Sequence, residues 1–434
     1  ASGVFPIIRG LIGDMIGPNS PMPIMDLRNG KDELQFLKRN DLEELSTRGT
    51  ASPDHVIRIK SRPLVLRESV WSQGREAIKE ELDKYAEEYK AMFERQAPQA
   101  DQPKTMLPTD PKNIWMEGIG LIGLGANAKA ASIAGDLVVQ NARVRAIGED
   151  AGGFRPISEK DLFDCEYWSL EQAKLGKGAP PKFQGKIVMI TGGSGTIGFA
   201  IAKAFSKLGA QTILVDKDEI ALKESVTKLG VGHKYFPIDV THSDAANQAL
   251  LAAINNFGGL DILISNAGAA HAGPMLGISN EELRNAFELN FFSHYSFSTE
   301  AAKILKDQNR GGQILFNISK QAVNPGKNFG AYGLPKATTF FLMRQLALEL
   351  GSDGIRVNGI NADRIRSGLL TDDFISSRAK SRGVSESEYM AGNLLNKEVT
   401  AEHVADAFTA LACAESTTGH VMTVDGGNIE ASLR

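Results

Sequence analysis

The stretch Gly185–Asp216, GKIVMITGGSGTIGFAIAKAFSKLGAQTILVD, determines the fold of the larger part of the chain. An apolar run at 187–191 leads into a glycine-rich turn, an amphipathic segment follows, and a second apolar run ends at Asp216. Strands of parallel sheets are buried on both faces and therefore read as continuous apolar runs. The stretch predicts a strand, a tight turn, a helix and a second strand, which together form a βαβ unit.

The same alternation of apolar runs and amphipathic segments continues to the end of the chain. We expect seven strands, at 187–191, 211–215, 234–238, 260–264, 312–318, 354–360 and 419–424. Strands separated by helices pair in parallel. Residues 183–434 are therefore predicted to form an α/β domain with a Rossmann-type, doubly wound, seven-stranded parallel sheet.

Residues 1–180 are predicted to form a smaller α/β accessory region. Residues 1–70 are rich in Gly and Pro, and their weak periodicity does not predict where helices or strands begin and end. Periodic apolar residues predict helices at about 75–96 and 126–146, and NIWMEGIGLIGLG (113–125) predicts a strand and a glycine turn. Residues 148–182 are predicted to be a linker with one aromatic segment.

The composition excludes several classes of function. The 434 residues include 48 basic and 52 acidic side chains, evenly spread, for a net charge of −4, so no nucleic-acid surface is expected. No apolar run is long enough to span a membrane. Cys165 and Cys413 cannot form a disulfide framework, which favours a cytoplasmic protein. The seven histidines form no HxH or HExxH motif, so we expect no metal site.

The glycine-rich turn is typical of a dinucleotide site. Glycines there let a pyrophosphate approach the backbone and the amides of the next helix, although a ligand-free tight turn is the alternative. The residues expected to bind the coenzyme are Gly192, Ser194, Gly195, Thr196 and Ile197. Asp216 ends the second strand, where a carboxylate accepts hydrogen bonds from ribose hydroxyls and repels a 2′-phosphate. We therefore expect NAD rather than NADP, although the adjacent Lys217 opposes that preference.

Further motifs follow in a fixed order: Asp239-Val240, Asn266-Ala267-Gly268, Asn290, Ser319, Tyr332 and Lys336. Tyr332 and Lys336 are four residues apart and so project from one face of a helix. With these motifs, residues 183–434 resemble a short-chain dehydrogenase/reductase domain over their whole length.

The resemblance implies a hydride-transfer site with Asn290, Ser319, Tyr332 and Lys336 as catalytic residues. Tyrosine has a pKa near ~10, and a neighbouring ammonium together with the positive nicotinamide ring would lower it so that Tyr332 could act as the base. The resemblance also implies that Lys336 binds the nicotinamide ribose, that Ser319 orients the substrate and that Asn290 anchors a relay water. Asn266, Ala267, Gly268, Asp239, Val240, Ile365 and Ser367 would line the coenzyme. The alternative is that Tyr332 and Lys336 are exposed helix residues and Ser319 a strand-end hydroxyl.

Three features depart from the family pattern. Thr196 replaces the middle glycine of TGxxxGxG, so the turn fits TGxxGxxG instead. Ala362-Asp363 replaces the usual Pro-Gly after the sixth strand. Pro335 directly precedes Lys336; because proline is tolerated in a first helical turn, we expect the helix to start close to it.

Three segments of the N-terminal region resemble a narrower family. RGTASPDHVIRIK (48–60), WMEGIGLIGLG (115–125) and DLFDCEYWSLEQAKLG (161–176) are similar to bifunctional aldolase/short-chain dehydrogenases. Residues 1–180 resemble only the C-terminal part of the aldolase/adducin-type half, and they lack its HxH metal motif. We therefore expect a structural module rather than a lyase, with His55 as a hydrogen-bonded structural residue.

The sequence thus favours an NAD-dependent oxidoreductase acting on a small hydroxyaldehyde, polyol or sugar-derived alcohol or carbonyl. A non-catalytic NAD-binding sensor or scaffold is the alternative, and part of a bifunctional sugar-phosphate aldolase is a third. Residues 366–398 are predicted to cover the pocket. Their charges (Arg366, Arg378, Lys380, Arg382) indicate either an anionic substrate or a solvated helix face. The resemblance implies a homodimer or homotetramer through 281–306 and 333–350, with Phe340 and Phe341 as contacts.

Overall fold

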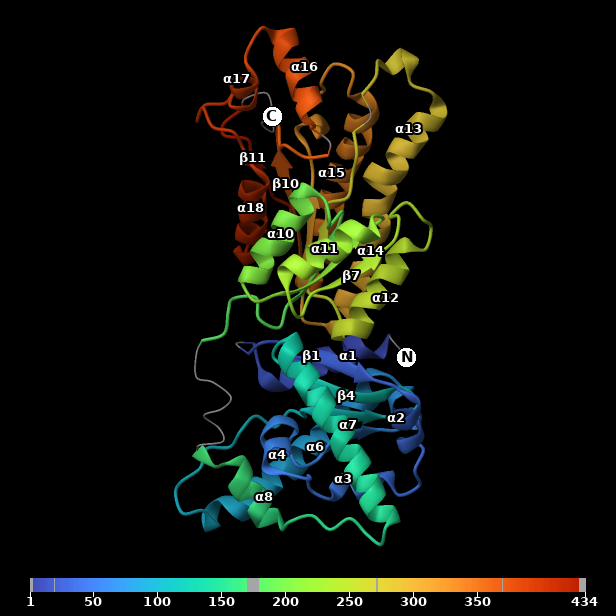
Figure 1. Cartoon of the computed structure of the whole chain (residues 1–434), viewed down its shortest axis with the longest axis vertical. Helices are drawn as coiled ribbons and strands as arrows, with labels where there is room; N and C mark the ends of the chain where they lie inside the picture. The colour runs from blue at the N-terminus through green and yellow to red at the C-terminus, as the bar shows by residue number, and fades with distance from the viewer. Residues whose placement is uncertain (1–2, 19, 170–178, 271, 369, 429–434) are drawn as a thin grey trace. The chain divides into compact units, whose positions relative to one another are not determined.

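A computed structural model describes residues 3–18, 20–169, 179–270, 272–368 and 370–428 (Figure 1). The chain divides into two compact units. The first comprises Ala1–Gly185 and Ile254–Gly259, and the second comprises Lys186–Ala253 and Leu260–Arg434. Among the described residues, no helix combines the length and the apolar character that a membrane crossing requires.

The second unit is built on a seven-stranded sheet in the order β11-β10-β9-β8-β5-β6-β7. All of its neighbouring strands pair in parallel. The prediction of a seven-stranded, doubly wound parallel sheet is therefore confirmed. The strands are β5 (Ile187–Thr191), β6 (Gln211–Asp216), β7 (Lys234–Pro237), β8 (Ile262–Ser265), β9 (Gly312–Asn317), β10 (Ile355–Ala362) and β11 (Val421–Val424).

The chain order reverses between β5 and β8, because β6 and β7 lie on one side of β5 and the later strands on the other. Every residue of β5 and β8 is buried, as their apolar sequences predict. Ligands of such sheets bind at the carboxyl ends of the strands, next to this reversal. The fold therefore places a site at the residues that follow β5, β8 and their neighbours.

Helices cover both faces of this sheet (Figure 1). α10 (Thr196–Lys207) packs against α11 (Glu219–Leu229) and α18 (Ala401–Cys413), and α14 (Ser293–Gln308) packs against α15 (Gly330–Leu350). The remaining α-helices that contain residues of this unit are α12 (Ala245–Phe257), α13 (Asn280–Phe287), α16 (Asp372–Arg382) and α17 (Glu386–Met390).

The first unit has a four-stranded sheet in the order β1-β4-β3-β2. β4 pairs antiparallel with β1 and β3, and β2 pairs parallel with β3. The strands are β1 (Ile24–Arg28), β2 (Leu64–Leu66), β3 (Asn113–Met116) and β4 (Gly120–Gly125). The α-helices are α1 (Val4–Ile16), α2 (Lys31–Phe36), α3 (Leu42–Thr47), α4 (Pro53–Ile59), α5 (Glu68–Trp71), α6 (Arg75–Gln96), α7 (Ala128–Asp150) and α8 (Glu159–Glu166).

The segment 113–125 forms a hairpin of two strands rather than the single strand that we expected. Gly118 and Gly120 adopt φ values of 75° and 149°, which allow the chain to reverse between β3 and β4. Gly123 lets α7 lie directly on β4, because a Cβ there would be 2.2 Å from the backbone nitrogen of Gly135. α6 has the predicted bounds, and α7 extends to Asp150, beyond the predicted end.

The predicted linker 148–182 contains α8 in its described part. Phe163 of α8 and the following Tyr167 stack at 4.5 Å between ring centroids, and both contact Phe93 of α6. The aromatic residues therefore fix this segment to the first unit. Residues 170–178 lie outside the described part of the chain.

Candidate active site

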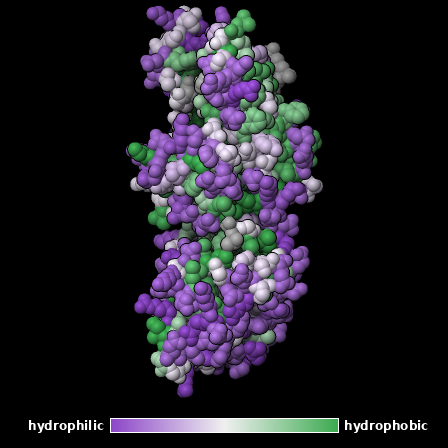
Figure 2. Space-filling view, turned by 90° about the vertical axis from the view of Figure 1, so that its right-hand side faces the viewer, coloured by the Kyte–Doolittle hydropathy of each residue, from purple (hydrophilic) through white to green (hydrophobic). Residues whose placement is uncertain are grey.

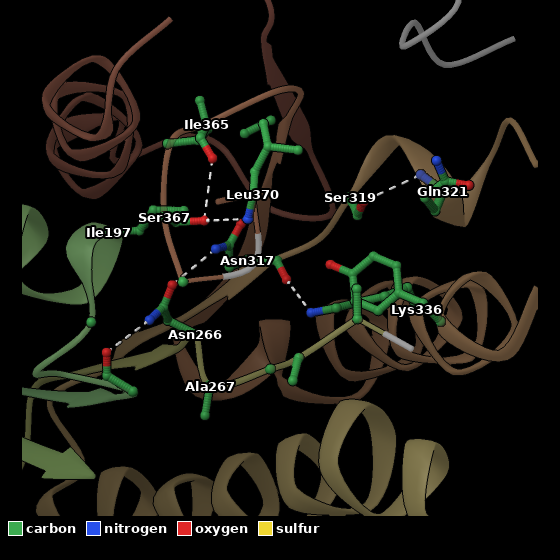
Figure 3. Close-up of a pocket in the computed structure, with 18 of the residues that line it drawn as sticks. Ile197, Asn266, Ala267, Asn317, Ser319, Gln321, Lys336, Ile365, Ser367 and Leu370 are labelled. Atoms are coloured by element: carbon green, nitrogen blue, oxygen red, sulfur yellow. Dashed lines mark hydrogen bonds between the residues drawn. The ribbon is translucent and has the colours of Figure 1, made fainter. Parts of the chain in front are cut away.

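A cavity of about 910 Å³ lies at the carboxyl ends of the parallel strands (Figure 3). It is lined by most of the residues that the sequence indicated as coenzyme-binding or catalytic: Gly192, Gly195, Thr196, Ile197, Asp216, Asp239, Val240, Asn266, Ala267, Gly268, Ser319, Tyr332, Lys336, Ile365 and Ser367. Ser194 and Asn290 do not line it. Residues from six different strand ends and loops therefore meet in one place.

The glycine turn explains the departure at Thr196. Gly192 has a φ of +63°, and a Cβ on Gly198 would lie 2.1 Å from the carbonyl oxygen of Gly192. Gly198 therefore cannot carry a side chain, whereas Thr196 is exposed and is the first residue of α10. The TGxxGxxG spacing fits this turn, and the first turn of α10 has backbone amides without helical partners, the groups that bind phosphates in other proteins.

Two carboxylates lie at the carboxyl ends of β6 and β7: Asp216 is the last residue of β6, and Asp239 follows β7. Asp216 accepts hydrogen bonds from the backbone nitrogens of Lys217, at 2.8 Å, and Ser194, at 3.3 Å. Ser194 thus orients Asp216 instead of lining the cavity. Asp239 accepts bonds from the backbone and hydroxyl of Thr241, which lower the pKa of its carboxyl group.

A hydrogen-bonded chain joins the ends of three strands, and the sequence analysis missed two of its members. The hydroxyl of Thr191 accepts the backbone amides of Asn266, at 2.9 Å, and Ala267, at 3.0 Å. The side-chain amide of Asn317 donates to the Asn266 side chain at 2.9 Å, and Lys336 Nζ donates to the Asn317 carbonyl at 3.0 Å (Figure 3). The two residues not identified from the sequence are Thr191 and Asn317. The only sequence signal for either was a polar residue at the end of a mostly apolar strand.

Tyr332 and Lys336 lie one turn apart on α15, and both are buried. Lys336 Nζ is 5.8 Å from the centroid of the Tyr332 ring. α15 begins at Gly330, so Pro335 lies past the first turn, contrary to the expected start of the helix. Pro335 is itself buried, and it cannot donate the backbone hydrogen bond of this helical position.

In the chain alone, Lys336 does not lower the pKa of Tyr332 below its usual value. Burial raises the pKa of Tyr332 to about 12, and the hydrogen bond with the Ser319 hydroxyl opposes this shift. Burial also lowers the pKa of Lys336 to about 8. Desolvation disfavours the charged form of each group, and this effect outweighs the attraction that we expected between phenolate and ammonium.

Asn290 lies in a π-helical turn, Glu288–Phe292, between α13 and α14. Such turns are frequent at functional sites. Its Nδ2 donates to the carbonyls of Ala269 and Ala286, at 2.9 and 3.1 Å, while its Oδ1 is buried and has no partner among the described residues. A Cβ on Gly268 would lie 2.9 Å from this Oδ1 and 3.5 Å from Lys336 Nζ, so both groups face the same glycine behind the cavity wall.

Asp363, which replaces the family's usual glycine, forms a small charged cluster. Its carboxylate is 3.3 Å from Lys320 Nζ and 3.4 Å from Arg364 Nε, and it accepts a bond from Asn428 Nδ2 at 2.6 Å. Arg364 adopts a φ of +52°, a conformation that is uncommon for a residue with a side chain. Lys320 and Arg364 were not indicated by the sequence analysis.

No group of three or more metal-ligating side chains occurs within the described residues. Both ring nitrogens of His55 are hydrogen-bonded, to Ser52 Oγ at 2.7 Å and to Gln140 Oε1 at 2.6 Å. Burial lowers the pKa of this histidine. His55 is therefore the structural residue that we expected.

Two family models match the chain. One, described as "Aldolase class II, second domain", matches residues 1–175, and the other, described as "Enoyl-(Acyl carrier protein) reductase", matches residues 193–428. The chain belongs to the short-chain dehydrogenase/reductase family. Its second unit is an NAD(P)-dependent domain of the type that acts on CH–OH groups, and an aldolase class II second domain precedes it.

The uncharacterized oxidoreductase YuxG of Bacillus subtilis (strain 168) is similar over both parts, with 31% identity over 445 residues. The match covers 98% of this chain, which spans 63% of that relative's length. Two solved structures share the second part, each with a TM-score of 0.52 and 56% coverage of this chain. The 3-ketoacyl-(acyl-carrier-protein) reductase from Brucella melitensis, complexed with NADH, is 25% identical with 98% of its chain covered. The L-sorbose reductase from Gluconobacter frateurii, complexed with NADPH and L-sorbose, is 28% identical with 95% covered.

Proposed function

We propose that the chain is an NAD-dependent oxidoreductase that transfers a hydride between nicotinamide and a small hydroxyaldehyde, polyol or sugar-derived alcohol or carbonyl. One observation carries this proposal: the buried Tyr332 and Lys336 share one face of α15 at the cavity, and Ser319 is hydrogen-bonded to Tyr332. This arrangement holds a proton acceptor, a cation and a positioning hydroxyl around one point.

Each group has a distinct task in alcohol oxidation. Ser319 positions the substrate oxygen, and Tyr332 accepts the hydroxyl proton, which an alcohol must lose for its carbon to become a carbonyl. Lys336 is protonated below its pKa of about 8 and favours the phenolate form of Tyr332 by its charge. Asn290 Oδ1 is a buried acceptor suited to a water that relays the proton onward from Lys336.

The residues at the other end of the cavity fit a dinucleotide. When bound, the coenzyme accepts the hydride. The glycine turn is the cradle for its pyrophosphate, because a Cβ at Gly198 would meet the backbone of Gly192. Gly195, Thr196 and Ile197 would surround the phosphates, with Ser194 orienting Asp216 beside them, and Asn266, Ala267 and Gly268 would line the middle. Asp239 and Val240 would contact the adenine, and Ile365 and Ser367 the carboxamide.

We assign NAD as the preferred coenzyme on the position of Asp216. Its carboxylate lies at the end of β6 and is held toward the glycine turn by the Ser194 amide. A carboxylate there accepts ribose hydroxyls and repels a 2′-phosphate.

The proposal is tested by mixing the protein with NAD⁺ and each of a panel of hydroxyaldehydes, polyols and sugar acids, and by measuring the rise in NADH absorbance. Tyr332→Phe is expected to lower turnover by at least about 10²–10⁴-fold, the usual contribution of a positioned base, and to leave NADH binding nearly intact. Tyr235→Phe is the control, because Tyr235 lies on β7 and outside the cavity lining. Full activity of Tyr332→Phe would refute the mechanism. NADH binding without turnover of any compound would instead favour the sensor or scaffold.

We also propose a cytoplasmic homodimer or homotetramer formed through α14 and α15. Phe341 and Leu348 of α15 are 68% and 81% exposed. Phe292 and Tyr295, at the start of α14, are also exposed. Phe340 is only half-buried and lies beside Arg344. Figure 2, which views the side of α13 and α14, shows hydrophobic groups among the hydrophilic surface. Light scattering of wild type and Phe341→Glu tests this, since the charge is expected to dissociate the oligomer.

A further inference from the structure

The end of the cavity that lies away from Asp216 is rich in cations. Lys320 follows β9, Arg364 follows β10, and Lys327, Arg378 and Arg382 also line this end. β10 is separated from β6 by three strands, which places these residues roughly 19 Å from the carboxylate at the end of β6. The only acidic residue of the described lining near β10 is Asp363, and it already contacts Lys320 and Arg364.

Two further cations of this lining, Arg378 and Arg382, are not offset by this carboxylate, and neither is the exposed Lys327. Arg378 and Arg382 lie one turn apart on α16, and both line the cavity. Neither forms an ion pair with a described residue, and Arg378 Nε is buried with no hydrogen-bond partner among those residues. Like charges four residues apart repel each other on a helix, and an anion bound between the two guanidinium groups would remove this repulsion.

Aromatic rings hold the two guanidinium groups in place. The Arg378 guanidinium lies 5.4 Å from the centroids of both Phe329 and Phe374, and that of Arg382 lies 5.2 Å from the Tyr389 ring. Stacking of this kind fixes the plane of an arginine while leaving its N–H donors free. Phe329 is also the residue that precedes α15, three positions before Tyr332. The pair is therefore fixed next to the helix that carries the proposed base.

Acidic side chains are available in the same segment, but they pair elsewhere. Arg366 binds Glu398 at 2.6 Å and Asp372 at 2.7 Å, both outside the cavity lining. A solvated helix face would pair Arg378 and Arg382 in the same way. The contacts of the half-buried Arg378 with two rings also argue against that alternative, which the sequence alone left open.

We infer that the substrate carries an anionic group with at least two oxygens, a phosphate ester or a carboxylate, which Arg378 and Arg382 bind while the reacting hydroxyl lies at Tyr332. Guanidinium groups recognise both anions through paired N–H donors. This inference rests on the proposed function and narrows its substrates to phosphorylated or acidic members.

The kinetic test compares three compounds with one carbon skeleton: glycerol, glycerol 3-phosphate and glycerate. The value of kcat/KM with NAD⁺ is expected to be at least about tenfold higher for one of the two anions than for glycerol. Comparison of glycerol 3-phosphate with glycerate then shows whether the site prefers a phosphate or a carboxylate. Equal values for all three compounds would overturn the inference.

The binding test does not depend on turnover, so that it separates this inference from the proposed function. Inorganic phosphate and glycerate are titrated by calorimetry into protein saturated with NADH, which occupies the glycine turn. Arg382→Gln and Arg378→Gln are each expected to weaken binding of whichever anion wild type binds more tightly, by about 10- to 100-fold.

Arg382 is exposed, so its substitution is not expected to impair folding. Lys380→Gln removes the same charge from an exposed position of α16 outside the cavity lining and should bind as wild type. Anion binding that is absent in wild type, or equal in wild type and the arginine variants, would refute the inference.

Discussion

Lys336 Nζ donates a hydrogen bond of 3.0 Å to the carbonyl oxygen of Asn317, the last residue of β9. This bond fixes the ammonium of α15 relative to the end of the sheet. Through Asn317 and Asn266 the connection reaches Thr191, the last residue of β5. The proposed catalytic lysine and the start of the glycine turn are thus joined through Asn317 and Asn266, two side chains of the cavity lining.

Thr191→Val tests this connection. Valine has nearly the same shape but leaves the backbone amides of Asn266 and Ala267 without an acceptor, and each unsatisfied buried donor costs about 1–3 kcal/mol. We expect the free energy of unfolding to fall by about 2–4 kcal/mol and NADH binding to weaken. Urea denaturation and NADH fluorescence measure both. Thr191→Ser retains the hydroxyl and should behave nearly as wild type, and equal losses in both variants would exclude the hydrogen-bonding role.

The limits of sequence-based prediction are clear in this same region. The seven strands could be predicted because strands buried on both faces must be apolar throughout. Thr191 and Asn317 were missed because a polar residue at a strand end is common, and its partners become adjacent only when the sheet forms. Asp363 was noticed as a departure, yet its ion pairs with Lys320 and Arg364 depend on the ends of two different strands.

The first unit shows a different limit. The hairpin β3–β4 was predicted as one strand because glycines supply no side-chain pattern, although Gly123 is needed for close packing of α7. The raised pKa of Tyr332 in the chain alone could not be predicted because burial cannot be read from spacing, and burial dominates the shift. Charge spacing alone likewise could not distinguish a solvated face from the stacked pair Arg378 and Arg382.

The pKa of Lys336 predicts how stability depends on pH. Burial lowers it from 10.5 to about 8, so between these values the unfolded chain binds a proton that the native chain does not. The free energy of unfolding therefore rises with pH in this window, and this gain is lost as the pH falls through 8, where Lys336 is protonated in both states. Between pH 7.5 and 9.5, we expect the free energy of unfolding of wild type to increase by about 2 kcal/mol relative to that of Lys336→Met.

Urea denaturation at three pH values in this range measures that difference. Lys327→Met is the control, because Lys327 is exposed and its substitution should give a difference from wild type that does not vary with pH. A pH-independent difference for Lys336→Met as well would show that the lysine is not desolvated in the folded chain.

Asn290→Ala tests the proposed relay. Removing the buried Oδ1 takes away the acceptor for a relay water, so kcat should fall about 10- to 100-fold while KM and NADH binding change little. The π-helical turn also loses two hydrogen bonds, so unfolding is measured in parallel. Asn285→Ala changes an exposed asparagine on the preceding helix and should leave kcat unchanged. A rise in KM with kcat preserved would assign Asn290 to substrate binding instead.

Asp216→Ala tests the coenzyme preference. The carboxylate at the end of β6 repels the 2′-phosphate of NADP, by about 1 kcal/mol in water at 4 Å and several times more in a partly buried site. The ratio of kcat/KM for NAD⁺ over NADP⁺ should therefore fall about 10- to 100-fold in the variant, through poorer use of NAD⁺ and better use of NADP⁺. Lys217 is retained in the variant and would attract the phosphate once the opposing charge is gone.

Glu219→Gln removes an exposed carboxylate three residues away and should leave the ratio within about twofold, since solvent and salt screen it. An unchanged ratio in Asp216→Ala would refute the ribose contact and move the basis of selectivity to the glycine turn, where Thr196 replaces the family's glycine.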